Sequence, residues 1–270
     1  MKTKEISILI GFLGALFTFS IIFLKRIAFG SYEFGIILGL TLSIVVLPYG
    51  IVVYLEDREN YILEKDLLDY LSQIESYVKS GKSLLFVLTI PKSERKKPLK
   101  KRLLQLEKML NLGMTPDEAL NRIAESMPTL ISKEAFSIIH RLIVYGGDVS
   151  GVLESAREHL GDLFAIENEK RSVMRNYGSI IYISFFILLV IIIFFIRFFV
   201  YKFASASFAT PFSSATNTTL LKNLMLQFLV IEGFVSGLIT GKLIAGKISS
   251  GFVHSAIMIL LTLVAYSIFL

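Results

Sequence analysis

The strongest constraint on the fold is a set of five apolar stretches, each about 20 residues long and almost free of charge. They are Ile6–Leu24, Phe34–Leu55, Tyr177–Tyr201, Asn223–Gly241 and Ile248–Leu270. Such a length spans the hydrocarbon core of a bilayer as a helix. With 54% hydrophobic residues and a mean hydropathy of +0.66, the composition also lies far from that of a soluble domain. We therefore predict an all-α, polytopic membrane protein with about five transmembrane helices.

Charged residues are concentrated between the second and third of these stretches. Residues 55–175 hold 19 Lys+Arg and 19 Asp+Glu, whereas the remaining residues hold 9 basic and 3 acidic ones. We therefore expect two transmembrane helices in 1–55, a water-soluble helical bundle in 56–175, and three transmembrane helices in 176–270. Because the soluble part is neutral, the net charge of +6 falls on the membrane flanks, where it suits anionic lipids better than nucleic acid.

Basic residues in the short flanks predict the orientation. If the N-terminus is cytoplasmic, the inner flanks carry nine Lys and Arg residues against five on the outer flanks. The inner set is Lys2, Lys4, Arg58, Lys65, Lys170, Arg171, Arg175, Lys242 and Lys247. We therefore expect a protein of the cell membrane whose N-terminus and soluble domain are cytoplasmic.

Apolar residues of the soluble domain repeat at helical spacing, which predicts amphipathic bundle helices. The two clearest stripes are Leu67, Leu71, Ile74 and Val78, and Leu99, Leu103, Leu106 and Leu110. After the second stripe, Thr115, Pro116 and Glu118 have the pattern of a capping box and predict a helix start.

The segment "YGGDVSG" predicts a bend between two helices. Asp148 is placed to cap a helix that runs unbroken from about Val149 into the third apolar stretch. Gly147, Asp148 and Gly151 are therefore our candidates for a structural or coupling bend.

Two segments resemble the phosphate-binding loop GxxxxGK[ST], and each lacks a different part. "GKLIAGKIS", from Gly241, has Ile248 where the hydroxyl belongs; "SYVKSGKS" has Ser76 in place of the first glycine. We interpret the first as a short inner turn between two spans, with glycines that allow close helix approach and lysines that contact headgroups. The residues of this inner turn are Gly241, Lys242, Gly246, Lys247, Gly251 and His254.

The second segment is interpreted as a helix junction. "GKSLLFVL" and "GMTPDEAL" both follow an amphipathic helix and share a glycine, a hydroxyl residue two positions later and a leucine seven positions later. A helix stop followed by a capped restart explains this similarity. We therefore predict no nucleotide site in either segment.

No catalytic, cofactor or metal site is predicted. The chain has no cysteine, and its three histidines, at 140, 159 and 254, are scattered. For His254, packing at headgroup level is favoured over a ligand role. Glu232 lies inside the fourth apolar stretch, where a carboxylate is costly. It either contacts a partner subunit or makes a hydrogen bond between helices.

The segment "KSERKKPLKKR" is the strongest concentration of charge, with seven basic residues against Glu94 alone. We expect a loop that is either merely solvated or a contact surface for lipid or an acidic partner. Its candidate contact residues are Lys92, Arg95, Lys96, Lys97, Lys100, Lys101 and Arg102.

Together these segments resemble the type II secretion system F domain family. The resemblance is carried by an amphipathic helix, the junction at Gly81, the capped "ALNRIAE" helix and "GGDVSGVLESAREHL". The C-terminal "GFVSGLITGKLIAGKISSGFVHS" is similar to the archaeal branch. Bacterial members usually carry two cytoplasmic domains and three spans, and many relatives have Glu where Asp148 stands.

This resemblance implies a non-enzymatic platform protein of a type IV pilus-like or archaellum assembly machine, without cofactors. Its implied partners are a cytoplasmic hexameric secretion ATPase, pilin or archaellin subunits, membrane lipids, and either a second copy or a related F-domain subunit. A small solute or ion transporter is the alternative, although Glu232 is the one acidic residue within the five stretches.

Overall fold

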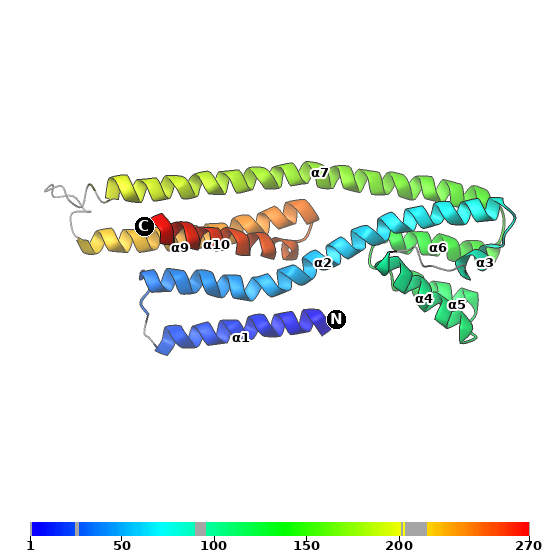
Figure 1. The fold of residues 1–270 in the computed structure, drawn as a ribbon, viewed down its shortest axis with the longest axis horizontal. Helices are drawn as coiled ribbons and strands as arrows, with labels where there is room; N and C mark the ends of the chain where they lie inside the picture. The colour runs from blue at the N-terminus through cyan, green and yellow to red at the C-terminus, as the bar shows by residue number, and fades with distance from the viewer. Residues whose placement is uncertain (1, 25–26, 90–95, 201, 203–214, 270) are drawn as a thin grey trace. The chain divides into compact units, whose positions relative to one another are not determined.

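The computed structural model of the chain describes residues 2–24, 27–89, 96–200, 202 and 215–269. These residues are largely helical, without a strand among them, which confirms the all-α prediction. They divide into two compact units (Figure 1). One, which we call the transmembrane unit, contains Met1–Leu55 and Arg171–Leu270; the other, the helical domain, contains Glu56–Lys170.

The transmembrane unit is built from the apolar helices. It contains α1 (Lys2–Leu24), the first part of α2 (Tyr32–Lys79), the second part of α7 (Val149–Phe195), the π-helical η1 (Ile196–Val200), α9 (Ala215–Ala245), the 3-10 turn η2 (Ile248–Ser250) and α10 (Gly251–Phe269). Four helices are long and apolar enough to cross a membrane: Tyr32–Lys79, Val149–Val200, Thr218–Ala245 and Ile248–Phe269. The remaining predicted span falls on α1, whose apolar stretch Glu5–Thr18 is shorter among the residues described.

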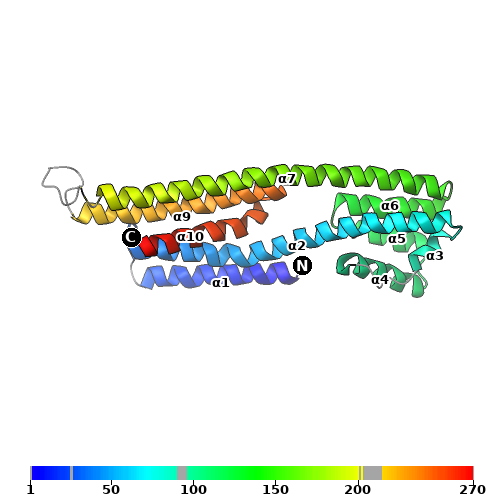
Figure 2. The ribbon, with the colours of Figure 1, turned by 45° about the horizontal axis from the view of Figure 1, so that its top comes forward.

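Helices α9 and α10 form an antiparallel hairpin with close backbone contact (Figures 1 and 2). A Cβ atom added at Gly251 would lie 2.6 Å from Cα of Leu238, and one added at Gly241 would overlap the backbone of Gly251. Small residues permit this approach where two helices pack in a membrane. The expected close approach at the glycines of this region is therefore present.

The helical domain surrounds a single hydrophobic core. It contains the second part of α2, then α3 (Leu84–Thr89), α4 (Lys97–Asn111), α5 (Pro116–Glu125) and α6 (Leu130–Tyr145), and the first part of α7 (Figure 2). Six of the eight predicted stripe residues are buried: Leu67, Leu71, Ile74, Leu99, Leu103 and Leu106. Each contributes roughly 1.5–3 kcal/mol through removal of its side chain from water. Val78 and Leu110 lie at the edge of the core.

The two similar segments of the helical domain are both helix junctions. Gly81 has φ +87° and Gly113 has φ +86°, and each ends its helix with the left-handed conformation that glycine adopts most readily. Ser83 and Thr115 then each accept an amide N–H three residues later over 3.3 Å. The interpretation as a helix stop and a capped restart is confirmed.

One helix boundary and one helix cap differ from the sequence-based expectations. The second span and the amphipathic helix after it form one helix, α2, of 48 residues that includes Pro48. Only half of the expected capping box forms at Thr115, whereas a reciprocal box links Thr129 with Ser132. By contrast, α7 runs unbroken from Val149 as expected, and its 47 residues correspond to a length of about 70 Å.

Candidate partner-docking site

A basic face on α4 is the clearest candidate site. Lys97, Lys100, Lys101 and Lys108 surround Leu104 and line a shallow groove of about 510 Å³. Their spacing of three, four and seven residues places them on one side of the helix. Leu104 is 48% exposed, so the face combines four cations with an uncovered apolar side chain. We call these four lysines the basic face.

The N-terminal end of the basic face is unfavourable for α4 itself. Three of its lysines lie in the first turns of the helix, which contain no acidic residue, and Lys96 at the N-cap makes no side-chain cap. Lys97 in the first turn meets the positive pole of the helix macrodipole, which costs about 0.3–1 kcal/mol; this effect falls off within the first turn, so Lys100 and Lys101 experience less of it. The macrodipole favours Lys108, which lies in the last turn, but it does not account for Lys97 at the other end, whose charge is consistent with a role in binding.

The structure changes part of the expectation for this segment. Lys92 and Arg95 lie outside the described residues. From Lys97 onward the segment is helix rather than loop. Lys96 is fixed through its backbone, because its N–H donates to Oδ2 of Asp66 over 3.0 Å. Arg102 does not belong to the basic face; its Nη1 donates to Oγ of Ser126, just after α5, over 3.4 Å.

Lys108 was missed in the sequence because it falls outside the run of charges. Helical periodicity counted from Lys97, Lys101 and Leu104 is the signal that identifies it.

The predicted bend is present at the start of α7. Gly146 and Gly147 have φ +67° and +103°, and Oδ1 of Asp148 accepts the N–H of Gly151 over 3.0 Å. The three atoms nearest to a Cβ added at Gly151 all belong to the Asp148 carboxylate. A Cβ atom at Gly151 would therefore displace the end of the flexible Asp148 side chain, and close packing of a neighbouring helix does not explain the glycine.

Next to this bend, four charged side chains connect α2 with α7. Glu75 contacts Lys79 over 2.7 Å and Arg157 over 3.0 Å, while Lys79 also contacts Glu154 over 3.1 Å. The hydrogen bond from Lys79, supported by Arg157, holds the pKa of Glu75 below its ordinary value. This cluster was not predicted from the sequence. The i, i+4 spacing of Glu75 and Lys79 indicates one ion pair, but nothing in the sequence joins that pair to α7.

Glu232 lies half-buried in α9. Its Oε1 accepts a hydrogen bond from Ser236 of the same helix over 2.9 Å. In the part of the chain that the structure describes, no hydrogen bond from another helix reaches Glu232. The alternative of an interhelical bond therefore loses its support.

The inner turn is shorter than expected. Helix α9 continues to Ala245, so Gly241 and Lys242 are helical, and the chain turns at Gly246, which has φ +72°, and Lys247. Since the first half of the segment is the end of a helix, it forms no loop that would wrap a phosphate.

His254 packs on α7 from the start of α10. Its Nδ1 lies 2.8 Å from Oη of Tyr182, and the two rings meet edge to face. In "SYVKSGKS", the second segment that resembles a phosphate-binding loop, the ammonium group of Lys82 lies over the rings of Tyr77 and Phe86. Among the described residues, no group of three or more His, Cys, Asp or Glu could hold a metal ion.

Comparison with known families gives a match in the central part of the chain. Residues 70–196 match the family model described as type II secretion system (T2SS), protein F. The chain carries a type II secretion system F domain. No curated protein and no solved structure gives a significant match.

The F domain match begins in the second part of α2 and ends at the start of η1. It therefore includes the basic face, the charged cluster and the bend. Proteins of this family are membrane platform proteins of secretion- and pilus-type systems, without enzymatic activity, and they work with secretion ATPases and pilin-like subunits. The apolar helices of this chain fit a multi-pass protein of the cell membrane.

Proposed function

We propose that the protein is the platform of a type IV pilus-like or archaellum assembly machine, and that it couples a cytoplasmic hexameric ATPase to the extraction and insertion of pilin subunits. The observation that carries this proposal is the F domain match over residues 70–196, joined to four helices that are able to span a membrane.

In this proposal the helical domain lies in the cytoplasm and receives the ATPase. The basic face supports such a contact because it offers four lysines around an uncovered leucine. Cations around an apolar centre favour an acidic partner surface and accelerate its encounter. The bend at Asp148 then leads directly into α7, the helix that continues into the transmembrane unit.

Within the membrane, Glu232 is the proposed contact for a pilin subunit. A carboxylate in a spanning helix is costly unless it serves a function, and only Ser236 donates to it among the residues described. The protein acts as a homodimer or beside a related F-domain subunit, and it hydrolyses no nucleotide itself.

The proposal is tested by removing the gene and complementing it. We expect cells without the protein to assemble no filaments on electron micrographs, with normal filaments after complementation. The purified full chain in lipid nanodiscs should bind the secretion ATPase of the same cell and should show no ATP hydrolysis alone. Filaments in the deletion strain together with solute uptake by proteoliposomes would instead support the transporter alternative.

A further inference from the structure

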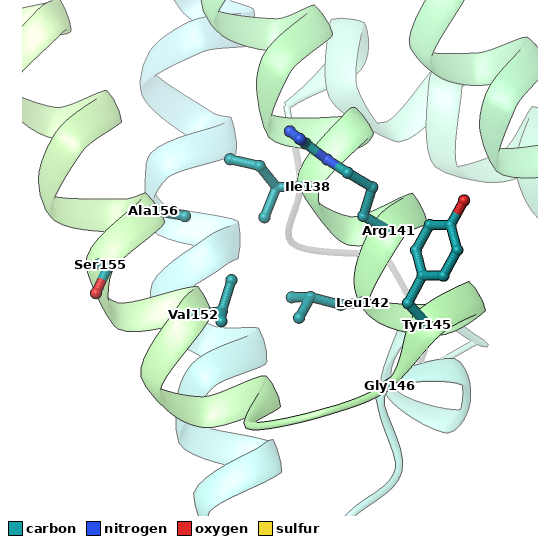
Figure 3. A pocket seen from close by; sticks show the side chains of 8 residues that line it. All are labelled: Ile138, Arg141, Leu142, Tyr145, Gly146, Val152, Ser155 and Ala156. Atoms are coloured by element: carbon teal, nitrogen blue, oxygen red, sulfur yellow. The ribbon is translucent and has the colours of Figure 1, made fainter.

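An open groove lies between the end of α6 and the start of α7, within the helical domain (Figure 3). It has a volume of about 440 Å³, within the range of ligand-binding pockets. Ile138 and Leu142 of α6 face Val152 and Ala156 of α7 across it, and the turn at Gly146 closes one end. The walls of the groove are therefore aliphatic.

The bend at the start of α7 explains why the groove is open. The residues Gly146 and Gly147, both with positive φ, reverse the chain without any side chain that could cover the aliphatic walls. Val152 stays 44% exposed, and Tyr145 at the rim is 81% exposed. Leu142 and Ala156 are buried, so Val152 and Tyr145 are the large apolar side chains of the lining that stay exposed. Exposed apolar side chains beside a concave site are available to a partner.

The charge at the rim is unbalanced. Nε of Arg141 donates to the carbonyl of Ser137 over a long 3.4 Å, and its terminal nitrogens contact no carboxylate among the described residues. The lining contains no acidic residue. Glu154, on the same part of α7, is paired with Lys79. Arg141 therefore has free donors of the planar geometry that binds a carboxylate through two hydrogen bonds.

We propose that the groove between α6 and α7 binds a segment of the cytoplasmic ATPase in which an apolar side chain stands next to a carboxylate. The apolar side chain enters between Leu142 and Val152, and the carboxylate pairs with Arg141 beside the phenol of Tyr145. This inference rests on the proposed function, and it adds a second contact to the basic face of α4.

The charge pattern favours a peptide segment over a lipid surface. Binding to anionic headgroups depends on several cations close together, each contributing about 1 kcal/mol. The basic face provides that arrangement, whereas the groove lining offers one guanidinium above an aliphatic wall. A single directed ion pair next to an apolar pocket selects one side-chain arrangement of a protein partner.

Binding is measured with the full chain in phosphatidylcholine nanodiscs and the purified ATPase, by biolayer interferometry at physiological salt. We expect Arg141→Glu to raise the Kd about tenfold or more, because it places a negative charge against the partner's carboxylate. Val152→Asp should raise it by a similar factor, because it places a charge against the partner's apolar side chain. Tyr145→Ala tests the rim without a charge change and should weaken binding by a smaller factor. Lys133→Glu is the matched control, since it reverses an exposed charge of α6 outside the lining and should change the Kd less than twofold.

The outcomes separate the two proposals. If the wild-type chain does not bind the ATPase, both the proposed function and the groove assignment are overturned. If it binds and the three groove variants bind equally well, only the groove assignment fails. If the groove variants change the oligomer mass of the protein and leave ATPase affinity intact, the groove is an interface between copies. Arg141→Lys, which keeps the charge and loses the planar fork, should fall between wild type and Arg141→Glu.

Discussion

Nε of Arg157 on α7 donates a hydrogen bond to Oε2 of Glu75 on α2 over 3.0 Å, across 82 positions of sequence. The other carboxylate oxygen of Glu75 accepts a bond from Lys79 over 2.7 Å. The Glu75 side chain is only 11% exposed. Its two cationic partners therefore compensate a carboxylate that would otherwise be costly to bury.

Glu75→Gln should lower the free energy of unfolding by about 1–2 kcal/mol, because the amide loses the charge that attracts both cations. Denaturant unfolding of the full chain in detergent micelles, followed by circular dichroism, measures the change. Glu158→Gln is the control, since that carboxylate is 66% exposed and lies 3.9 Å from Arg157. An equal effect of both substitutions would show that the Glu75 contacts contribute nothing specific.

The stability difference between wild type and Glu75→Gln should depend on pH. Hydrogen bonding from Lys79, followed by Arg157, lowers the pKa of Glu75 in the folded protein from its ordinary value of 4.5. The stabilisation is therefore complete above pH 4.5 and is lost as pH falls through the lower folded pKa. The stability difference between wild type and Glu75→Gln should stay constant near neutrality and shrink in acid. A difference that grows in acid would contradict this assignment.

Local features of the helical domain were predictable because neighbouring residues determine them. The stops at Gly81 and Gly113 follow from the freedom of glycine at positive φ, and the apolar stripes follow from the helical period. The continuity of α2 was missed because composition changes sharply after Leu55. The change from apolar to charged residues means that the helix passes from an apolar environment into water. It does not end the helix, because the residues that follow, such as Glu56 and Glu59, are good helix formers.

The candidate site was predictable only in part, because it depends on where α4 begins and on how helices pack. A run of basic residues is visible in the sequence, and so is the cap at Asp148. Whether a lysine joins a common face depends on where the helix begins, and α4 begins at Lys97, inside the run rather than after it. The groove at Arg141 depends on how α6 and α7 pack, which local sequence does not specify.

The cap at Asp148 should be coupled to Gly151. Asp148→Ala removes the acceptor of the Gly151 N–H and should cost about 1 kcal/mol of stability. Gly151→Ala should gain about 0.5–1 kcal/mol in the Asp148→Ala background, as expected for alanine within a helix. In the wild-type background it should gain less, since the new Cβ would overlap the Asp148 carboxylate. Additive changes in unfolding free energy across this double-mutant cycle would show that the two residues are independent.

The proposed orientation predicts the accessibility of fusion sites. Reporters placed after Arg58 and after Lys242 should be active in the cytoplasm, because the basic flanks favour that side. A reporter after Ser213, which lies outside the described residues, should be active on the outer side. Alkaline phosphatase and a fluorescent protein at each site give opposite readouts. A reversed pattern would place the helical domain away from any cytoplasmic ATPase and remove that part of the proposed function.

The basic face of α4 should act mainly through long-range attraction. We expect replacement of Lys97, Lys100, Lys101 and Lys108 by Glu to weaken ATPase binding and filament assembly, since exposed charges steer encounter within a Debye length of about 8 Å. Helix content should be preserved, because Glu and Lys have similar helix propensities, and the macrodipole gain at Lys97 in the first turn offsets the loss at Lys108 in the last turn. Arg122→Glu with Lys133→Glu, both exposed outside this face, is the control. If the fourfold variant loses affinity for anionic liposomes and still binds the ATPase normally, the face contacts lipid; unchanged behaviour in both assays would mean that its lysines are merely solvated.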